Sequence, residues 1–397
     1  MTAALAPADE GGVVAAILAA RAAREPLAIE GRGTKAGMLR PVQAARSLST
    51  RNLVGVSLYS PHELIVSAAA GTTIPALEAT LAESGQGIIA EPPDLSGLLG
   101  HDGVQTLGGV VATNLSGPRR VAWGAMRDHV MGVRAVNGAG EVIRSGGRVL
   151  KNVTGLDLCK LLAGSHGTLA VITEVTLKVL PVAELTGSLV LPGLDAVRGV
   201  AALSAALGSP YGVSGAAWLP DEAAARVPVL AGRGPVAVIR IEDFAASVAY
   251  RLGRLVTDLA AFGAAVVLDD GDSRAAWRAI RDAVPLRAEP GDAVWRVSVR
   301  PSNGPAVVAA LDGAQCFLDL GGGLVWIAAA PALHDRVVAA AQAGRGTWTV
   351  LRAPEPMRAA VYVVPPEVPA LAAITRRVKA AMDPAGILNP GRLWAGV

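Results

Sequence analysis

The chain contains 397 residues, which is long enough for two domains and too long for one simple core. Its net charge is only +3, its aromatic content is 4%, and acidic and basic residues are interspersed, so we expect no nucleic-acid-binding surface. Although 52% of the residues are hydrophobic, no uninterrupted apolar run reaches the roughly 18 residues that a membrane-spanning helix needs.

The N-terminus and the cysteines bear on location and redox chemistry. The apolar residues 13–20 follow two acidic residues and precede Arg21, which is the wrong charge order for a secretory signal peptide. Cys159 and Cys316 stand far apart and form no metal-binding or redox motif. We therefore expect a cytoplasmic protein with reduced thiols and no metal site.

The first notable motif is a glycine-rich turn, Gly31-Arg32-Gly33-Thr34-Lys35, which follows a predicted helix over 11–24 and a predicted strand over 27–29. Glycine permits positive φ and lets backbone amides approach a ligand closely. The spacing is not that of the Rossmann fingerprint, because the next glycine, Gly37, comes one residue late. In addition, a loop over 47–51 is predicted where a helix of usual length should follow. Alone, this turn would be interpreted as an ordinary loop.

A second glycine-rich stretch, Thr106-Leu107-Gly108-Gly109-Val110-Val111-Ala112-Thr113-Asn114-Leu115-Ser116-Gly117, follows a predicted strand (64–69), helix (73–84) and strand (88–90). A helix over 107–115 would present its N-terminal amides and positive dipole end at Thr106–Gly109. The alternative is a helix start with tight helix–sheet packing. Two such turns, separated by a strand–helix–strand pattern, indicate one extended ligand that carries a diphosphate, for which a dinucleotide is the natural candidate.

The remaining pattern divides at Pro181. Before it we predict a hairpin (130–136 and 141–144), a helix (155–162), a third glycine turn (164–168) and a strand (168–179). After it, strands near 186–191, 213–219, 235–241, 264–269, 293–299, 315–320 and 324–329 alternate with helices near 194–207, 243–262, 273–283, 303–311 and 333–343. A helix over 366–382 and a turn-rich tail, 383–392, end the pattern.

The glycine-rich stretches, in this order, resemble the vanillyl-alcohol-oxidase-type FAD-binding domain, also called the PCMH-type domain. The resemblance covers residues 1–181 and rests on Gly31–Lys35, Thr106–Gly109, Asn114, Ser116-Gly117, Trp123-Gly124, Arg127-Asp128, Lys151–Asp157 and Gly164–Glu174. The chain as a whole resembles the FAD-binding subunits of bacterial glycolate oxidases. This second resemblance rests on Gly117-Pro118-Arg119-Arg120, on Lys151–Asp157 and on Asn389-Pro390-Gly391-Arg392-Leu393.

The resemblance implies an α+β fold with three parts. These are a two-subdomain PCMH-type FAD-binding domain over 1–181, an α+β cap domain over 182–352, and a C-terminal helix and tail over 353–397 that packs back on the FAD domain. It also implies cofactor-binding residues. Gly31, Arg32, Gly33, Thr34 and Lys35 would wrap the FAD diphosphate with backbone amides. Thr106, Leu107, Gly108, Gly109, Asn114, Ser116 and Gly117 would line the ribityl and flavin side, and Val171 and Ile172 the adenosine side.

Two departures from this family pattern matter. Many members tether FAD through a histidine in the first loop, where this chain has Thr34 and Lys35, so FAD is expected to bind non-covalently. Catalytic relatives that oxidise 2-hydroxy acids carry a histidine-rich metal and base motif, whereas only His334 among the five histidines lies beyond residue 181. Of the others, His166 in the third glycine turn is a candidate to face FAD. No catalytic residue can therefore be assigned from the sequence.

Three functions follow from the resemblance and these departures. In the first, the chain is the FAD-binding subunit of a multi-subunit 2-hydroxy acid (glycolate) oxidase, with an electron-relay or assembly role. Its partners would be a homologous catalytic flavin subunit and an iron–sulfur subunit, and the complex would be cytoplasmic or peripheral to the inner face of the membrane. The alternatives are a stand-alone flavin oxidoreductase and a non-catalytic scaffold with the same fold.

Overall fold

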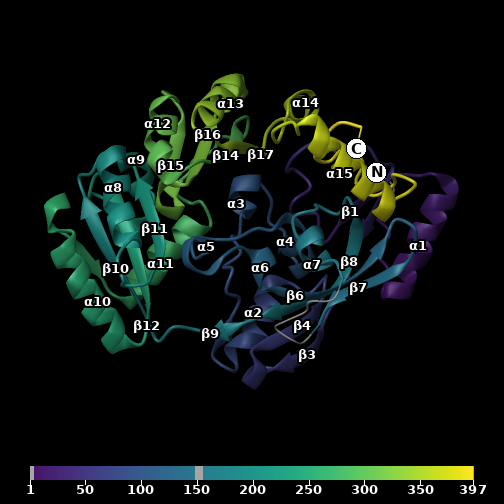
Figure 1. Cartoon of the computed structure of the whole chain (residues 1–397), viewed down its shortest axis with the longest axis horizontal. Helices are drawn as coiled ribbons and strands as arrows, with labels where there is room; N and C mark the ends of the chain where they lie inside the picture. Colours follow the sequence, from purple (N-terminus) through teal and green to yellow (C-terminus); the bar gives the residue numbers. More distant parts are fainter. Residues whose placement is uncertain (1–3, 148–154, 397) are drawn as a thin grey trace.

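The computed structural model describes residues 4–147 and 155–396. Residues 151–154 of the motif Lys151–Asp157 lie outside these described residues. The chain builds two sheet-centred halves that stand side by side, a five-stranded sheet from the N-terminal half and an eight-stranded sheet from the C-terminal half (Figure 1). Both sheets are antiparallel and both halves mix helices with strands, so the predicted α+β class is confirmed.

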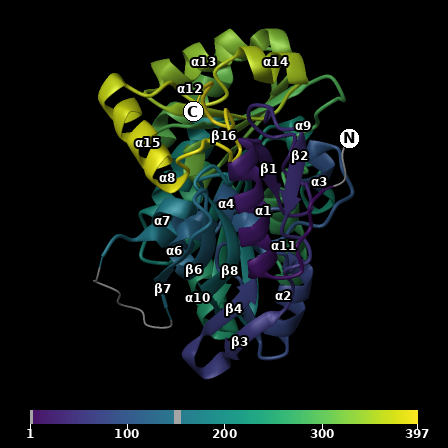
Figure 2. The same cartoon turned by 90° about the vertical axis from the view of Figure 1, so that its right-hand side faces the viewer.

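The N-terminal half begins with α1 (Glu10–Ala23), whose first turn is capped because the Asp9 carboxylate accepts from the Gly12 amide at 2.7 Å. The helix lies beside β6 of the five-stranded sheet (Figure 2). Strand β1 (Leu27–Glu30) pairs in parallel with β2 (Arg46–Ser49). The prediction of a loop over 47–51 is therefore wrong for its first residues. The sequence pattern did not indicate β2, because Ser47-Leu48-Ser49 has only one apolar side chain to bury. The strand becomes evident only from its pairing with β1.

The five-stranded sheet has the order β3-β4-β8-β6-β7. Its strands are β3 (Val56–Ser60), β4 (Ile65–Ala69), β6 (Val130–Asn137), β7 (Val142–Gly146) and β8 (Ala170–Lys178). Helices α2 (Ile74–Ala82), α4 (Leu107–Thr113) and α7 (Leu158–Leu162) bury their apolar faces in its core. The hairpin predicted over 130–144 is confirmed as β6 and β7.

The predicted strand over 88–90 is wrong. The strand at this point is β5 (Gln86–Gly87), which pairs with β9 (Leu180–Pro181), and residues 88–90 lead into a turn. Ile88 and Ile89 are nevertheless 6% and 5% exposed. Their hydrophobicity serves burial rather than strand pairing, which periodicity alone cannot distinguish.

The eight-stranded sheet has the order β13-β10-β12-β11-β15-β16-β14-β17. Its strands are β10 (Leu185–Pro192), β11 (Val213–Leu219), β12 (Val236–Asp243), β13 (Val266–Leu268), β14 (Ala293–Ser298), β15 (Gln315–Asp319), β16 (Leu324–Ala329) and β17 (Thr347–Arg352). The helices of this half are α8 (Ala196–Leu207), α9 (Asp221–Ala224), α10 (Ala245–Asp258), α11 (Asp270–Arg281), α12 (Gly304–Ala309) and α13 (His334–Ala343). Strand β17 was not predicted from the sequence.

Two tryptophans of the strands and one of a helix show how the two faces of this sheet are covered. Trp218 donates to the Leu194 carbonyl at 2.9 Å beside α8, and Trp295 donates to His334 of α13 at 3.3 Å. On the opposite face, Trp277 of α11 donates to Ser188 Oγ of β10 at 2.9 Å. Helices α8 and α13 thus cover one face, while α11 and the N-terminal half cover the other.

Short helices complete the chain: α3 (Ser96–Leu99), α5 (Arg120–Trp123), α6 (Met126–His129) and the 3-10 turns η1 (Pro61–Glu63), η2 (Pro228–Leu230), η3 (Ala260–Phe262), η4 (Pro301–Asn303), η5 (Leu320–Gly322) and η6 (Pro331–Leu333). None of the helices in the described residues has both the length and the apolar character needed to cross a bilayer.

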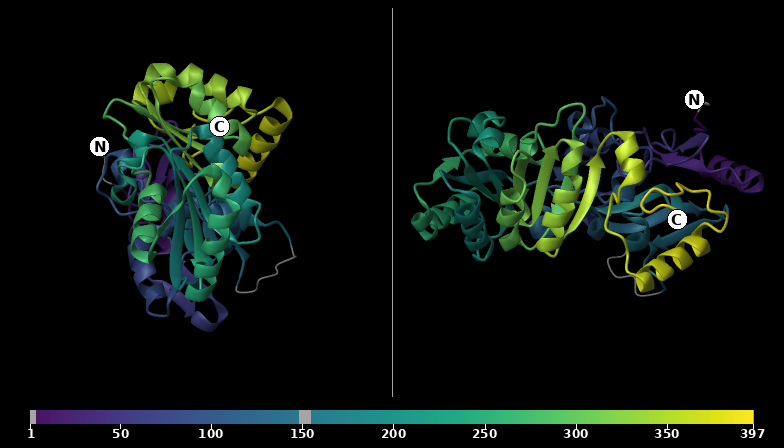
Figure 3. Two further views of the ribbon diagram at one scale, coloured as in Figure 1. Left: turned by 90° about the vertical axis from the view of Figure 1, so that its left-hand side faces the viewer. Right: turned by 90° about the horizontal axis from the view of Figure 1, so that it is seen from above.

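The C-terminal segment returns to the N-terminal half through α14 (Glu355–Ala360) and α15 (Pro369–Met382). Seen from above, α15 and the tail lie over that half rather than over the eight-stranded sheet (Figure 3). Leu388 forms a parallel bridge with Leu27 of β1. The Lys379 ammonium is buried beneath the tail and donates to Asp383 Oδ2, the Leu388 carbonyl and the Thr168 carbonyl at 2.7–2.8 Å.

Candidate cofactor-binding site

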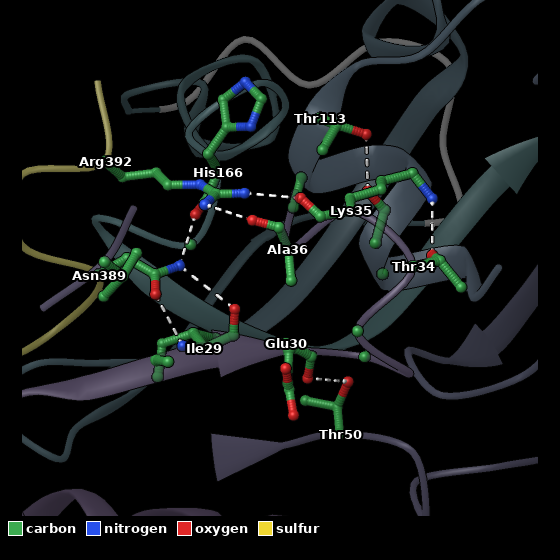
Figure 4. Close-up of a pocket in the computed structure, with 18 of the residues that line it drawn as sticks. Ile29, Glu30, Thr34, Lys35, Ala36, Thr50, Thr113, His166, Asn389 and Arg392 are labelled. Atoms are coloured by element: carbon green, nitrogen blue, oxygen red, sulfur yellow. Dashed lines mark hydrogen bonds between the residues drawn. The ribbon is translucent and has the colours of Figure 1, made fainter. Parts of the chain in front are cut away.

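A cavity of about 320 Å³ lies where the first glycine turn, the start of α4, the start of β8 and the C-terminal tail meet. It is shown in Figure 4. Of the predicted residues, Gly31, Arg32, Gly33, Thr34, Lys35, Thr106, Gly108, Gly109, Val171 and Ile172 line it. The structure thus brings together segments that stand about 70 and 140 residues apart in the sequence. A Cβ atom on Gly31 would lie only 2.3 Å from Thr106 Oγ1, so the two glycine-rich stretches touch.

The first glycine turn has free backbone donors. Gly33 has φ +75°, which a residue with a side chain adopts only with strain. The amides of Arg32, Gly33, Thr34 and Lys35 donate to no other group within residues 4–147 and 155–396. Successive unpaired amides in a turn of this kind form a concave anion site, so this donor set fits a diphosphate.

The carbonyl side of the same loop is held from behind by Arg392 in the tail. Its guanidinium donates to the carbonyls of Lys35 at 2.6 Å, Ala36 at 3.1 Å and Arg40 at 3.1 Å (Figure 4). Burial, with a further effect of the Arg358 charge, lowers the pKa of Arg392 to about 10. Arg392 thus binds the carbonyl groups of the loop from the tail side, while the amides of residues 32–35 stay unpaired on the other side and available for a ligand.

Lys35 adds a cation at the cavity wall. Its ammonium donates to Gln105 Oε1 at 3.2 Å and to Thr34 Oγ1 at 3.4 Å. Burial lowers the pKa of Lys35 to about 8, although the charge of Asp94 acts in the opposite direction. An anionic ligand in the cavity would favour the charged ammonium, which supports the same ligand chemistry as the free amides.

The second glycine stretch does not present its amides as predicted. The amides of Leu107 and Gly108 donate to the carbonyls of Thr72 and Ala70, and the Gly109 amide faces Thr106 Oγ1 at 3.4 Å. A Cβ on Gly108 would lie 2.7 Å from the Ala70 Cβ. The alternative reading of tight helix–sheet packing therefore accounts for Gly108. Gly109 still faces the cavity, since its Cβ would point towards Lys35 Nζ at 3.9 Å.

Four predicted residues lie outside the cavity wall: Leu107, Asn114, Ser116 and Gly117. Leu107 is fully buried in the core. Asn114 ends α4 with φ +51° and accepts from the Arg127 amide, while Ser116 Oγ accepts from the Met126 amide at 2.8 Å. A Cβ on Gly117 would lie 2.4 Å from the Glu91 carbonyl oxygen. Asn114 and Ser116 thus hold the segment that leads through α5 and α6 to β6 of the five-stranded sheet.

The tail supplies site residues that were not assigned from the sequence. Asn389 accepts from the Ile29 amide at 2.7 Å and donates to the carbonyls of Ile29 and His166. Its side chain therefore connects strand β1 to the third glycine turn at the cavity wall. His166, in the third glycine turn, lines the cavity as suspected, and burial together with the Arg392 charge lowers its pKa to about 3. The motif Asn389–Arg392 was visible in the sequence, but only the folded chain shows what it touches.

Within residues 4–147 and 155–396, no group of three or more His, Cys, Asp or Glu side chains is placed to hold a metal ion. His334, the one histidine of the C-terminal half, is the first residue of α13 and accepts from the buried Trp295. Its environment is that of a packing residue.

Comparisons with known proteins agree with this geometry. Residues 1–146 match the family described as "FAD binding domain", and residues 363–393 match "FAD linked oxidases, C-terminal domain". The glycolate oxidase subunit GlcE of Escherichia coli K12 is 32% identical over 378 residues, covering 94% of this chain and 93% of the relative. A D-lactate dehydrogenase of Archaeoglobus fulgidus is 33% identical over 159 residues, 39% of this chain and 33% of that protein.

Among solved structures, p-cresol methylhydroxylase with substrate bound superposes with a TM-score of 0.73 at 14% identity, covering 99% of this chain and 88% of that one. This likeness establishes the PCMH-type fold. The motif-based resemblance is thereby confirmed, and FAD is the cofactor. The chain belongs to the family of FAD-linked oxidoreductases that contains the E. coli glycolate oxidase subunit GlcE.

Proposed function

We propose that this chain is the FAD-binding subunit of a multi-subunit 2-hydroxy acid oxidase, with glycolate as the substrate of the complex. The observation that carries the proposal is similarity along nearly the whole chain to a glycolate oxidase subunit, joined to a row of free amides suited to a diphosphate. A homologous catalytic flavin subunit and an iron–sulfur subunit would complete the enzyme. The B. subtilis glycolate oxidase subunit GlcD is 40% identical over 93 residues, 23% of this chain and 19% of that subunit.

In this proposal residues 1–181 and the tail 353–397 hold FAD, and residues 182–352 form the cap. Gly31–Lys35 bind the diphosphate, Val171 and Ile172 contact the adenosine side, and Asn114, Ser116 and Gly117 border the flavin side. When bound, FAD supplies the redox chemistry, while the protein binds, orients and shields it. The complex would work in the cytoplasm or against the inner face of the membrane.

FAD is expected to be released by acid. No histidine stands in the first glycine turn, and Lys35 offers a cation rather than an imidazole for a covalent link. Precipitating the purified protein with trichloroacetic acid should leave a yellow supernatant and a colourless pellet. Flavin fluorescence that stays with the protein band in a denaturing gel would contradict non-covalent binding.

Removing the tail's hold on the loop should weaken FAD binding. Arg392→Gln deletes charge-assisted hydrogen bonds to three carbonyls, so we expect a loss of roughly 2–4 kcal/mol in the free energy of unfolding and at least tenfold weaker FAD binding. Urea unfolding and FAD titration of the apoprotein measure the two effects. The matched control is Arg377→Gln on the exposed side of α15, which should change neither quantity. Unchanged FAD affinity in Arg392→Gln would show that the loop does not depend on the tail.

The isolated chain is expected to oxidise glycolate poorly, because His334 is held in the core by Trp295 and cannot serve as a base. Anaerobic mixing of the FAD-loaded chain with glycolate or D-lactate should leave the flavin absorbance oxidised, and adding partner subunits should allow bleaching. Bleaching of the chain alone at about 1–10³ per second, as in ordinary enzymes, would instead establish a stand-alone oxidoreductase. A chain that purifies without flavin and takes up none would be a scaffold.

A further inference from the structure

A further cavity, of about 300 Å³, lies where helix α7, the third glycine turn and the C-terminal segment meet (Figure 2). The wall of this tail cavity is mainly apolar, with Leu161, Leu169, Ile374, Val378, Leu393 and Trp394. Four polar residues complete it, namely Ser165, Thr168, Thr375 and Lys379. Leu161 and Ile374 are 36% and 54% exposed, so the cavity opens to solvent at the edge they form. A concave, mostly apolar wall with a few polar groups is typical of a small-molecule site.

Ser165 presents an unpaired hydroxyl to this cavity. Its side chain is only 7% exposed, and its Oγ has no hydrogen-bond partner among the residues that the structure describes. The backbone of Ser165 is already engaged, because its amide donates to the Leu162 carbonyl and its carbonyl accepts from Thr168 Oγ1 at 2.7 Å. A buried hydroxyl without a partner has lost its hydration and gained nothing in return. The Ser165 hydroxyl is therefore a donor available to a molecule in the tail cavity.

Lys379 brings no free charge to the cavity. An ammonium has three protons, and Lys379 donates to Asp383 Oδ2 and to the carbonyls of Leu388 and Thr168 at 2.7–2.8 Å. The Asp383 carboxylate also balances its charge. No aspartate or glutamate lines the tail cavity within residues 4–147 and 155–396. An ionised ligand would be buried here without a counter-charge, at high cost, so the cavity favours an uncharged ligand.

The other polar side chains of the wall are also engaged. The Thr375 hydroxyl donates to Glu367 Oε1 at 2.8 Å, and the Trp394 indole N–H donates to the Pro365 carbonyl at 3.2 Å. This leaves the Ser165 O–H as the free side-chain donor on the described part of the wall. A single donor in an apolar cavity matches a ligand with a single acceptor, such as a carbonyl oxygen.

The third glycine turn separates the tail cavity from the FAD cavity. Residues 166–167 line the FAD cavity. Ser165 and Thr168, on either side of them, line the tail cavity. On the opposite wall, Leu393 directly follows Arg392, whose guanidinium holds the carbonyls of the first glycine turn. Both walls of the tail cavity are therefore continuous with segments that shape the FAD site.

We propose that the tail cavity binds an uncharged, mainly apolar molecule whose carbonyl oxygen accepts from Ser165 Oγ, and that this molecule strengthens FAD binding. The bound molecule contacts the third glycine turn on one side and α15 and Leu393 on the other. It therefore favours the docked tail, in which Arg392 holds the first glycine turn. By linkage, FAD must strengthen binding of the molecule by the same factor. The proposal requires FAD binding and does not depend on the oxidation of a 2-hydroxy acid.

Isothermal titration of the full, FAD-loaded chain with acetophenone, ethylbenzene and benzoate tests the site. Acetophenone carries the carbonyl, ethylbenzene has a similar shape without it, and benzoate adds a charge. Saturable acetophenone binding is expected, whereas benzoate should not bind, because its carboxylate would be buried without a cation. Ser165→Ala should weaken acetophenone binding about fivefold through the loss of one hydrogen bond, and should not weaken ethylbenzene binding. The matched control Ser84→Ala, at an exposed serine just after α2, should bind like the wild type.

The melting temperature of Ser165→Ala distinguishes a ligand-binding hydroxyl from a structural one. Because the substitution removes an unpaired buried group, the unliganded variant should melt at the wild-type temperature or above it. Ile374→Trp provides a second variant at the exposed edge of the cavity. Its larger side chain should fill the entrance and block both acetophenone and ethylbenzene, which keeps the test decisive if Ser165→Ala fails to fold.

FAD titration of the apoprotein tests the link between the two cavities. Saturating acetophenone should tighten FAD binding by about fivefold or more, and this gain should vanish in Arg392→Gln. The site is overturned if the wild type shows no saturable acetophenone binding, if folded Ser165→Ala binds it like the wild type, or if benzoate binds equally well. An FAD affinity that saturating acetophenone leaves unchanged or weakens overturns the link to the cofactor.

Discussion

Gly33→Val is expected to abolish FAD binding, reducing affinity by more than about a hundredfold. Gly33 has φ +75°, and valine is among the residues that tolerate this backbone region least. The loop would have to change its backbone conformation, which would disperse the four free amides of Arg32–Lys35 that form the anion site. Flavin content of the purified variant, followed by FAD titration of the apoprotein, measures the loss.

The same loop offers a matched control. Gly37 has no positive φ, is exposed, and a Cβ placed on it would meet no atom within 4 Å. Gly37→Val should therefore retain FAD at wild-type affinity and melt at a similar temperature. If the Gly33 and Gly37 variants both fold and both retain full FAD binding, the diphosphate lies elsewhere and the assignment of this turn is wrong.

Features encoded by local residues were predictable from the sequence. The glycine turn at 31–35, the helix predicted over 73–84 and found as α2, and the hairpin β6–β7 each depend on residues within a few positions of one another. Propensity and turn chemistry suffice for such features. The order of the motifs also identified the family, because the motifs come from several separate segments of the same fold.

Features that depend on distant partners were missed or misassigned. The amides of α4 were expected to face a ligand, but Ala70 and Thr72, more than 30 residues earlier, supply carbonyls that occupy two of them. The tail motif was recognised as part of the resemblance, yet nothing local shows that Arg392 reaches the carbonyl of Lys35. Long-range hydrogen bonds of this kind follow from the assembled fold and not from periodicity.

The junction between the two halves is a further case, since Glu242 and its partner Arg119 stand 123 residues apart in the sequence. In the structure it forms two hydrogen bonds with Arg119, at 2.6 and 3.1 Å, across the junction. Arg240, 1% exposed, binds Glu91 with two hydrogen bonds of 2.9 and 3.1 Å and stacks 4.6 Å from the centre of the Trp277 ring. Both pairs fix the eight-stranded sheet against the segment that follows residue 90.

Arg240→Met is therefore expected to lower the free energy of unfolding by about 3–5 kcal/mol at pH 7, because it leaves the Glu91 carboxylate buried without its principal partner. Glu91→Leu combined with Arg240→Met should recover most of this loss, since an apolar pair of similar size leaves no uncompensated charge. Urea unfolding of the wild type, both single variants and the double variant gives the coupling energy. The control Arg254→Met removes an exposed 4.0 Å pair with Asp258 and should cost less than about 1 kcal/mol.

The effect of Arg240→Met should also depend on pH in a definite direction. Burial alone would raise the pKa of Glu91, but the charges of Arg240 and Arg119 outweigh burial and hold it below its ordinary value. A carboxyl whose pKa is lowered by folding contributes stability above its unfolded pKa of about 4.5 and loses that contribution as the pH falls through its folded pKa. In the variant this pKa should rise, so protonation relieves the buried charge. The difference in unfolding free energy between wild type and variant should therefore be largest near pH 7 and shrink towards pH 4. A difference that stays constant over this range would mean that Arg240 stabilises the junction by packing on Trp277 and not through Glu91.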